Sequence, residues 1–166
     1  MTLCTRKPAL QPMKIIRVMF VCLGNICRSP MAECVLKDMV AKRGLSQQFY
    51  INSSATSTYE IGNPIHYGTQ RRLKQAGVPL VEHRAVQLRP SDYEKYDYFI
   101  GMDASNRSNM IRILKNDPEG KVHLMLDYTD HPRDVADPWY TGDFDATYED
   151  IVAGCEGFLR TVLMGV

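Results

Sequence analysis

The residues with the clearest chemical potential lie in the stretch VCLGNICRSP, at positions 21–30. Cys22 can act as a nucleophile, and Arg28, six positions later, carries a planar guanidinium that can hold two oxygens of an anion. Gly24, between them, can adopt backbone angles that are closed to other residues. We interpret this spacing as a loop that binds an oxyanion and presents a sulfur to it.

A buried strand and a helix are expected on either side of this loop. The apolar run at 15–20 leads into Cys22, and an apolar stripe predicts a helix over 30–43, with Ser29 and Pro30 as natural first residues. Backbone N–H groups that turn inward beside the positive end of a helix bind phosphate and favour a thiolate. The same donors would therefore hold the anion and activate Cys22, and the hydroxyl of Ser29 would add a hydrogen bond to the sulfur. We expect phosphate binding by Leu23, Gly24, Asn25, Ile26, Cys27 and Arg28.

Strands and helices alternate along the rest of the chain. Strands are predicted at 49–52, 96–102 and 121–126, helices at 69–76, 103–114 and 145–164, and loops at 53–64 and 127–143. This alternation predicts a parallel sheet with helices on both faces. We expect an α/β fold with a single domain over 14–166, whose four-stranded, parallel, twisted sheet has flavodoxin-like order. Residues 1–13 are expected to form a loose extension.

Composition argues against several classes of function. The net charge of +1 offers no electrostatic footprint for nucleic acid, and no apolar run is long enough to span a membrane. Five irregularly spaced cysteines favour a reduced, cytoplasmic protein over a disulfide framework. The four histidines supply no close pair that could join Cys22 and Cys27 as ligands, so we expect neither a metal nor a cofactor.

A candidate acid lies in the segment DVADPWY at 134–140. Pro138 stiffens the backbone after Asp137, although this dipeptide alone is also typical of an ordinary turn. A carboxylic acid beside a bound phosphate dianion stays protonated closer to neutral pH, and it can then protonate a departing oxygen.

Tyr59, Trp139 and Tyr140 could wall a slot that is deep enough for an aryl phosphate and too deep for a serine phosphate.

Both segments, in this order, resemble the low-molecular-weight protein tyrosine phosphatase family, and the resemblance runs from about residue 14 to the C-terminus. It implies that Cys22 attacks phosphorus, that Arg28 holds the equatorial oxygens, and that Asp137 acts first as general acid and then as general base. The expected intermediate is a cysteinyl-phosphate. The expected partners are phosphotyrosine-containing proteins, with phosphate or other oxyanions as ligands, and the expected state is a monomer or weak dimer.

The resemblance also implies supporting contacts around the loop. Ser53 should buttress Asn25, and His83 should pair with Asp103 beneath the loop. The chain departs from the family pattern at Val86, where arginine is usual, and at 54–57, where a common glycine is missing.

A second thiol on the loop predicts redox chemistry. Cys27 lies five positions after Cys22, and a nearby thiol can trap an oxidised thiolate as a reversible disulfide. We therefore predict redox switching between these two cysteines. The alternative is that Cys27 simply packs under the loop.

Three rival functions share parts of this pattern. An arsenate reductase of the same fold would need relay cysteines in the middle of the chain, and none lies between Cys34 and Cys155. A protein arginine phosphatase commonly has threonine where this chain has Ile26. A module that binds phosphate groups without catalysis is the third rival. The presence of Cys22, Arg28 and Asp137 together argues against it.

Overall fold

The computed structural model describes residues 14–164, and the predicted extension at 1–13 lies outside them. Four parallel strands form one sheet in the order β2-β1-β3-β4. The strands are β1 (Ile16–Cys22), β2 (Phe49–Ala55), β3 (Tyr98–Gly101) and β4 (Val122–Leu124). This is the flavodoxin-like order that we predicted. It places β1 in the interior of the sheet, between β2 and β3.

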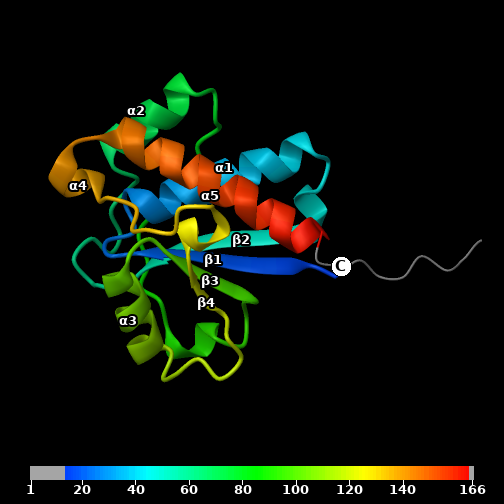
Figure 1. Cartoon of the computed structure of the whole chain (residues 1–166). Helices are drawn as coiled ribbons and strands as arrows, with labels where there is room; N and C mark the ends of the chain where they lie inside the picture. Colours follow the sequence, from blue (N-terminus) through cyan, green and yellow to red (C-terminus); the bar gives the residue numbers. More distant parts are fainter. Residues whose placement is uncertain (1–13, 165–166) are drawn as a thin grey trace, which may run out of the picture.

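Helices cover both faces of the sheet, as predicted. They are α1 (Arg28–Lys42), α2 (Tyr67–Gln75), α3 (Ala104–Ile113), α4 (Pro138–Thr141) and α5 (Phe144–Met164). Figure 1 shows α1, α2 and α5 on one side of the sheet and α3 on the other. Within residues 14–164, none of these helices combines the length and the apolar character that crossing a membrane requires.

The interior strand β1 separates two apolar clusters. Side chains of successive strand residues point to opposite faces, so Val18 and Phe20 pack toward α1 and α5. Met19 and Val21 pack with the side chains on the α3 side, among them Met110. Because both faces are covered, β1 is a nearly continuous apolar run that ends at Cys22, and its register leaves the thiol at the carboxyl edge of the sheet.

Several boundaries differ from the sequence prediction. The strand β2 continues through the first three residues of the predicted loop at 53–64, because Ser53, Ser54 and Ala55 pair in register with the end of β1. The predicted loop at 127–143 contains the short helix α4 and begins within a 3-10 turn, Met125–Tyr128. The strands β3 and β4 are shorter than predicted, and α1 begins at Arg28, two residues early.

Candidate active site

The thiol of Cys22 lies at the turn from β1 into α1, where hydrogen-bond donors surround it. The backbone N–H of Asn25 donates to Sγ at 3.3 Å, and that of Ser29 donates at 3.4 Å. The hydroxyl of Ser29 lies 3.0 Å from the same sulfur. This hydroxyl already accepts a hydrogen bond from Asn25 Nδ2 at 2.8 Å, so its proton can point to sulfur. Hydrogen-bonding groups of the loop and of α1 therefore surround the sulfur.

The side chain of Asn25 pins the loop. Its backbone is left-handed, with φ of 59°, and the residue is fully buried. The amide nitrogen donates to Ser29 Oγ and, at 3.0 Å, to Ser53 Oγ, so the predicted contact between Ser53 and Asn25 is present. The amide oxygen accepts from His83 Nε2 at 2.8 Å and from the backbone N–H of Val86 at 3.1 Å. Every donor and acceptor of this amide is therefore occupied.

The predicted pair between His83 and Asp103 is wrong. Asp103 follows β3, on one side of β1, whereas the segment around His83 lies beside β2, on the other side. The ring of His83 instead contacts Asn25 and places Nδ1 3.8 Å from Glu33 Oε1. Burial lowers the pKa of His83 from its ordinary value, while Glu33 acts in the opposite direction. Glu33 also accepts a hydrogen bond from Ser53 at 2.6 Å, which links it to the loop.

The guanidinium of Arg28 is buried and held by three acceptors. Nη1 donates to Asp103 Oδ2 at 2.7 Å and to the carbonyl oxygen of Val135 at 2.9 Å, and Nη2 donates to Asp137 Oδ2 at 3.3 Å. Burial alone would lower the pKa of Arg28, but Cys22, Asp103 and Asp137 outweigh it and raise that pKa. Arg28 is therefore a fixed cation in the wall of the site.

The carboxylate of Asp137 faces the loop from the start of α4. Its Oδ1 caps this short helix by accepting a hydrogen bond from the backbone N–H of Trp139 at 3.0 Å, and its Oδ2 is the atom that contacts Arg28. The preceding backbone is anchored by the hydroxyl of Thr147, which donates to the carbonyl oxygen of Ala136 at 3.1 Å. The carboxylate therefore has a fixed orientation.

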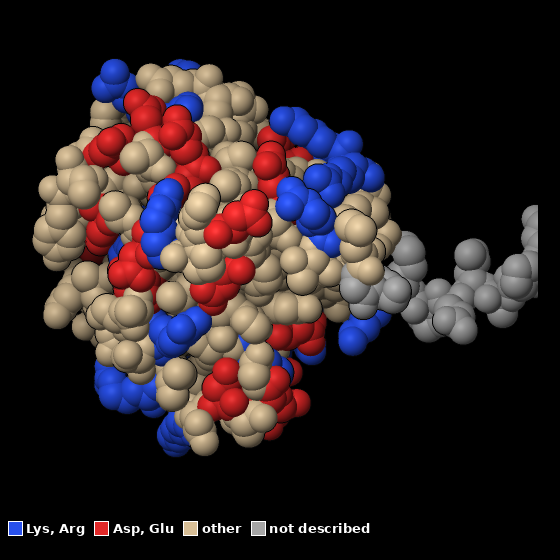
Figure 2. All heavy atoms as spheres, viewed as in Figure 1, with Lys and Arg blue, Asp and Glu red and all other residues tan. Residues whose placement is uncertain are grey.

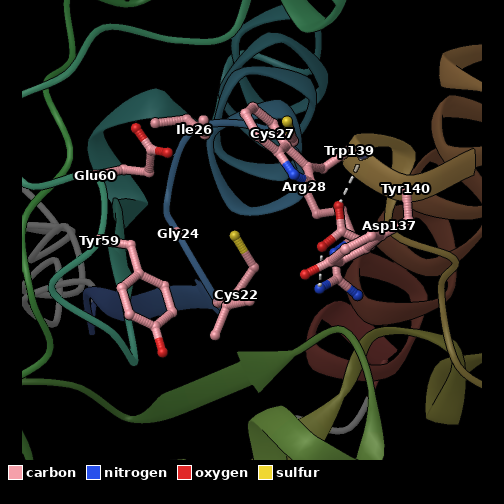
Figure 3. Close-up of a pocket in the computed structure, with 11 residues that line it drawn as sticks. Cys22, Gly24, Ile26, Cys27, Arg28, Tyr59, Glu60, Asp137, Trp139 and Tyr140 are labelled. Atoms are coloured by element: carbon pink, nitrogen blue, oxygen red, sulfur yellow. Dashed lines mark hydrogen bonds and ion pairs between the residues drawn. The ribbon is translucent and has the colours of Figure 1, made fainter. Parts of the chain in front are cut away.

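These groups surround a pocket of about 220 Å³. In Figure 3, the sulfur of Cys22 points into the space between Tyr59 on one side and Asp137 with Tyr140 on the other. The rim aromatics are largely exposed, at 78% for Tyr59 and 76% for Tyr140, so they are free to contact a ligand. The lining residues are Cys22, Leu23, Gly24, Ile26, Cys27, Arg28, Tyr59, Glu60, Asp137, Trp139 and Tyr140.

Sequence reasoning missed Glu60 at this pocket and Glu33 beneath the loop. Glu60 is the neighbour of Tyr59 and lies against Gly24, where an added Cβ would meet Glu60 Cγ at 3.3 Å. Glu33 was detectable as a carboxylate one helical turn after Ser29. Within residues 14–164, no group of three or more His, Cys, Asp or Glu side chains could hold a metal ion.

Cys27 is the second thiol at the pocket. Burial raises its pKa to about 12, and Cys22 and Asp137 act in the same direction. The thiol therefore stays protonated at neutral pH. Both cysteines are free in the structure, so a disulfide between them stays a prediction.

A cysteine sulfur that receives backbone N–H groups and faces a pocket with a fixed guanidinium and a carboxylate is typical of one class of hydrolase. Enzymes of this class transfer a phosphoryl group through a covalent intermediate. The chain matches the family model for low molecular weight phosphotyrosine protein phosphatase over residues 17–164, and it belongs to that family.

Named relatives share most of the chain. A low molecular weight protein-tyrosine-phosphatase of Bacillus subtilis, YfkJ, is 39% identical over 150 residues, which cover 89% of this chain and 96% of the relative. The human low molecular weight phosphotyrosine protein phosphatase is 38% identical over 152 residues, covering 86% and 93%.

Solved structures agree with this assignment. The crystal structure of YfkJ superimposes with a TM-score of 0.88 at 38% identity, covering 92% of this chain and 97% of that one. A Drosophila arginine phosphatase superimposes with a TM-score of 0.80 at 33% identity, covering 89% and 98%.

Proposed function

We propose that this chain is a protein tyrosine phosphatase that cleaves phosphotyrosine through a cysteinyl-phosphate intermediate. The observation that carries the proposal is the position of the Cys22 sulfur, which receives two backbone N–H groups and points into a pocket walled by Arg28 and Asp137. The first step brings the Cys22 thiolate to phosphorus. The S–P bond forms as the P–O bond to tyrosine breaks, and Asp137 gives its proton to the departing oxygen.

The second step releases phosphate. Asp137 takes a proton from water, the oxygen of that water attacks phosphorus, and the S–P bond breaks to restore the Cys22 thiolate. The hydroxyl of Ser29, 3.0 Å from the sulfur, stabilises this leaving group. Through both steps, Arg28 and the loop N–H groups hold the equatorial oxygens, where charge develops.

The pocket rim supports phosphotyrosine as the substrate. Tyr59 and Tyr140 stand on opposite sides of the sulfur and can sandwich a flat ring. The nearly buried Ile26 adds an apolar wall, which suits a phenyl ring better than the N–H groups of a guanidinium. Arginine phosphatase activity is the second candidate, because a protein described as an arginine phosphatase shares this fold.

We propose phosphotyrosine-containing proteins as partners and the cytoplasm as the location. The described cysteines, Cys22, Cys27, Cys34 and Cys155, are all free and buried, which fits a reducing compartment. Figure 2 shows basic and acidic side chains mixed over one face of the molecule, with no large patch of a single sign there. That face offers no footprint for a polyanion such as nucleic acid.

Hydrolysis of a phosphotyrosine peptide and of a phosphoarginine peptide tests the proposal. Cys22→Ser should reduce kcat by about ten-thousand-fold or more, because it removes the nucleophile. Asp137→Asn keeps the cap of α4 and should lower kcat/KM for phosphotyrosine about a hundredfold or more, because it removes the proton. Cys34→Ala, at a buried position in α1 outside the pocket, is the matched control. Activity that survives Cys22→Ser would refute the mechanism, and faster cleavage of phosphoarginine would refute the substrate.

A further inference from the structure

His66 joins the two halves of the site. It lies just before α2, and its backbone N–H donates to the carbonyl oxygen of Ile26, in the phosphate-binding loop, at 2.8 Å. Its ring stands edge-on to the indole of Trp139, with ring centroids 5.7 Å apart and an interplanar angle of 80°. One residue therefore contacts both the loop that holds the nucleophile and the turn that holds the acid.

The ring of His66 is itself fixed from the other side. It stacks on Phe144, the first residue of α5, at 5.3 Å and 19°. Phe144 in turn packs against Ile26 and Cys27. A Cβ at Gly68 would overlap the Phe144 ring, so this glycine lets the two helices approach closely. Trp139, His66 and Phe144 thus form an aromatic bridge from the acid-bearing turn to the underside of the phosphate-binding loop.

A hydrogen bond sets the orientation of the His66 ring. Nδ1 accepts from the backbone N–H of Gly68 at 2.9 Å, which caps α2 and leaves the proton of the neutral ring on Nε2. Capping would be served equally by asparagine, a common residue at such positions. The contact with Trp139 needs the ring.

We propose that His66 is a positioning residue for the general acid, an inference that rests on the proposed phosphatase function. Trp139 is 56% exposed and belongs to a helix of only four residues, yet its backbone N–H orients the Asp137 carboxylate. By holding the indole, His66 holds the turn in the conformation in which Asp137 faces the leaving oxygen. The interaction free energy of one aromatic pair, expressed as an equilibrium constant, changes the population of that conformation about two- to tenfold.

Two variants separate the ring from the cap. His66→Asn keeps an N-cap acceptor and removes the ring, whereas His66→Phe keeps a ring and removes the acceptor. His123→Asn is the matched control, because His123 also contacts two aromatic rings, but these rings, Tyr98 and Tyr128, do not line the pocket as Trp139 does. If removal of a histidine ring lowered activity only by destabilising the fold, His123→Asn should lower it as well.

The measurement is kcat/KM for two esters with different leaving groups. Phenyl phosphate needs protonation of its oxygen, whereas 2,4-dinitrophenyl phosphate needs little. His66→Asn should lower kcat/KM for phenyl phosphate about two- to tenfold and leave that for the dinitrophenyl ester within about twofold. Competitive inhibition by inorganic phosphate should not change, because the phosphate-binding loop keeps its contacts. His66→Phe and His123→Asn should retain the wild-type ratio between the two esters.

Equal losses on both esters in His66→Asn, or no loss on either, would overturn the inference. A changed ratio in His66→Phe with an unchanged ratio in His66→Asn would also overturn it, because the cap of α2, and not the ring, would then position the acid. Failure of the proposed function looks different. A wild-type protein that hydrolyses neither ester would overturn both, whereas an active wild type with a silent His66→Asn overturns the positioning role alone.

Discussion

Replacing Asn25 tests whether a left-handed residue, whose side-chain amide has all its hydrogen bonds made, holds the loop at 22–28 in shape. Its side chain makes four hydrogen bonds, to Ser29, Ser53, His83 and Val86. Asn25→Ala and Asn25→Gly both remove these four bonds. Only the alanine must also adopt the φ of 59° with a Cβ. The pair of variants therefore separates the backbone from the side chain.

The magnitudes follow from burial and backbone geometry. Each hydrogen bond is worth about 1 kcal/mol net, and Val86 is exposed, so water can replace part of the loss. Loss of the amide should therefore cost about 2–4 kcal/mol in both variants. Left-handed backbone costs alanine about 1–2 kcal/mol more than glycine, which outweighs the roughly 0.4–1 kcal/mol that alanine normally gains through the unfolded state. Asn25→Gly should therefore be more stable than Asn25→Ala by about 1 kcal/mol.

Urea unfolding followed by circular dichroism measures this difference. With an m-value of about 2 kcal/mol/M, the midpoint of the glycine variant should lie about 0.5 M above that of the alanine variant. The inhibition constant for inorganic phosphate should rise in both, because the loop N–H groups lose their anchor. An alanine variant as stable as the glycine variant would refute the reasoning, since it would show that the loop does not demand the left-handed backbone.

Two other expected outcomes concern the second thiol and the packing of α5. Mild peroxide should convert Cys22 to a sulfenic acid. The Cys27 thiolate then attacks that sulfur, forming a disulfide and expelling hydroxide, which takes a proton from solvent to become water. Because the pKa of Cys27 is raised to about 12, trapping by mass spectrometry should show crosslinking that accelerates from pH 6.5 to 8.5. A pH-independent rate, or over-oxidised Cys22 without a crosslink, would contradict this. Gly157→Ala should cost about 1–3 kcal/mol in thermal unfolding, because its Cβ would overlap the carbonyl oxygen of Tyr128. A loss no larger than that of Glu156→Ala, at the exposed neighbouring position, would show that α5 can move aside.

The layered fold was predictable from the sequence because its strands and helices have strong patterns. Alternating segments with a buried first strand were enough to predict the parallel sheet and its two layers of helices. The end of β2 was not predictable in this way. Ser53 and Ser54 are buried although they are polar, and the hydroxyl of Ser53 is satisfied by hydrogen bonds to Asn25 and Glu33. A search for apolar periodicity assigns such polar residues to a loop.

The site was predictable where its residues are neighbours in the sequence, and less so where they are not. Cys22 and Arg28 belong to one local motif, and the structure places both at the pocket. The partner of His83 depends on which carboxylate the fold brings close to its ring, Glu33 or Asp103. Spacing along the sequence does not determine this. His66 has no motif of its own, because its contacts come from two segments that are joined only in the folded chain.

The tethers of Arg28 determine when an active site can exist during synthesis of the chain. Its partners Asp103, Val135 and Asp137 lie 75, 107 and 109 residues further on. Cys22 and Arg28 thus leave the ribosome well before the groups that orient the arginine. A chain that ends before these partners would carry Cys22 and Arg28 without the contacts that fix the guanidinium, so the arrangement around the pocket forms only when both halves of the domain are present.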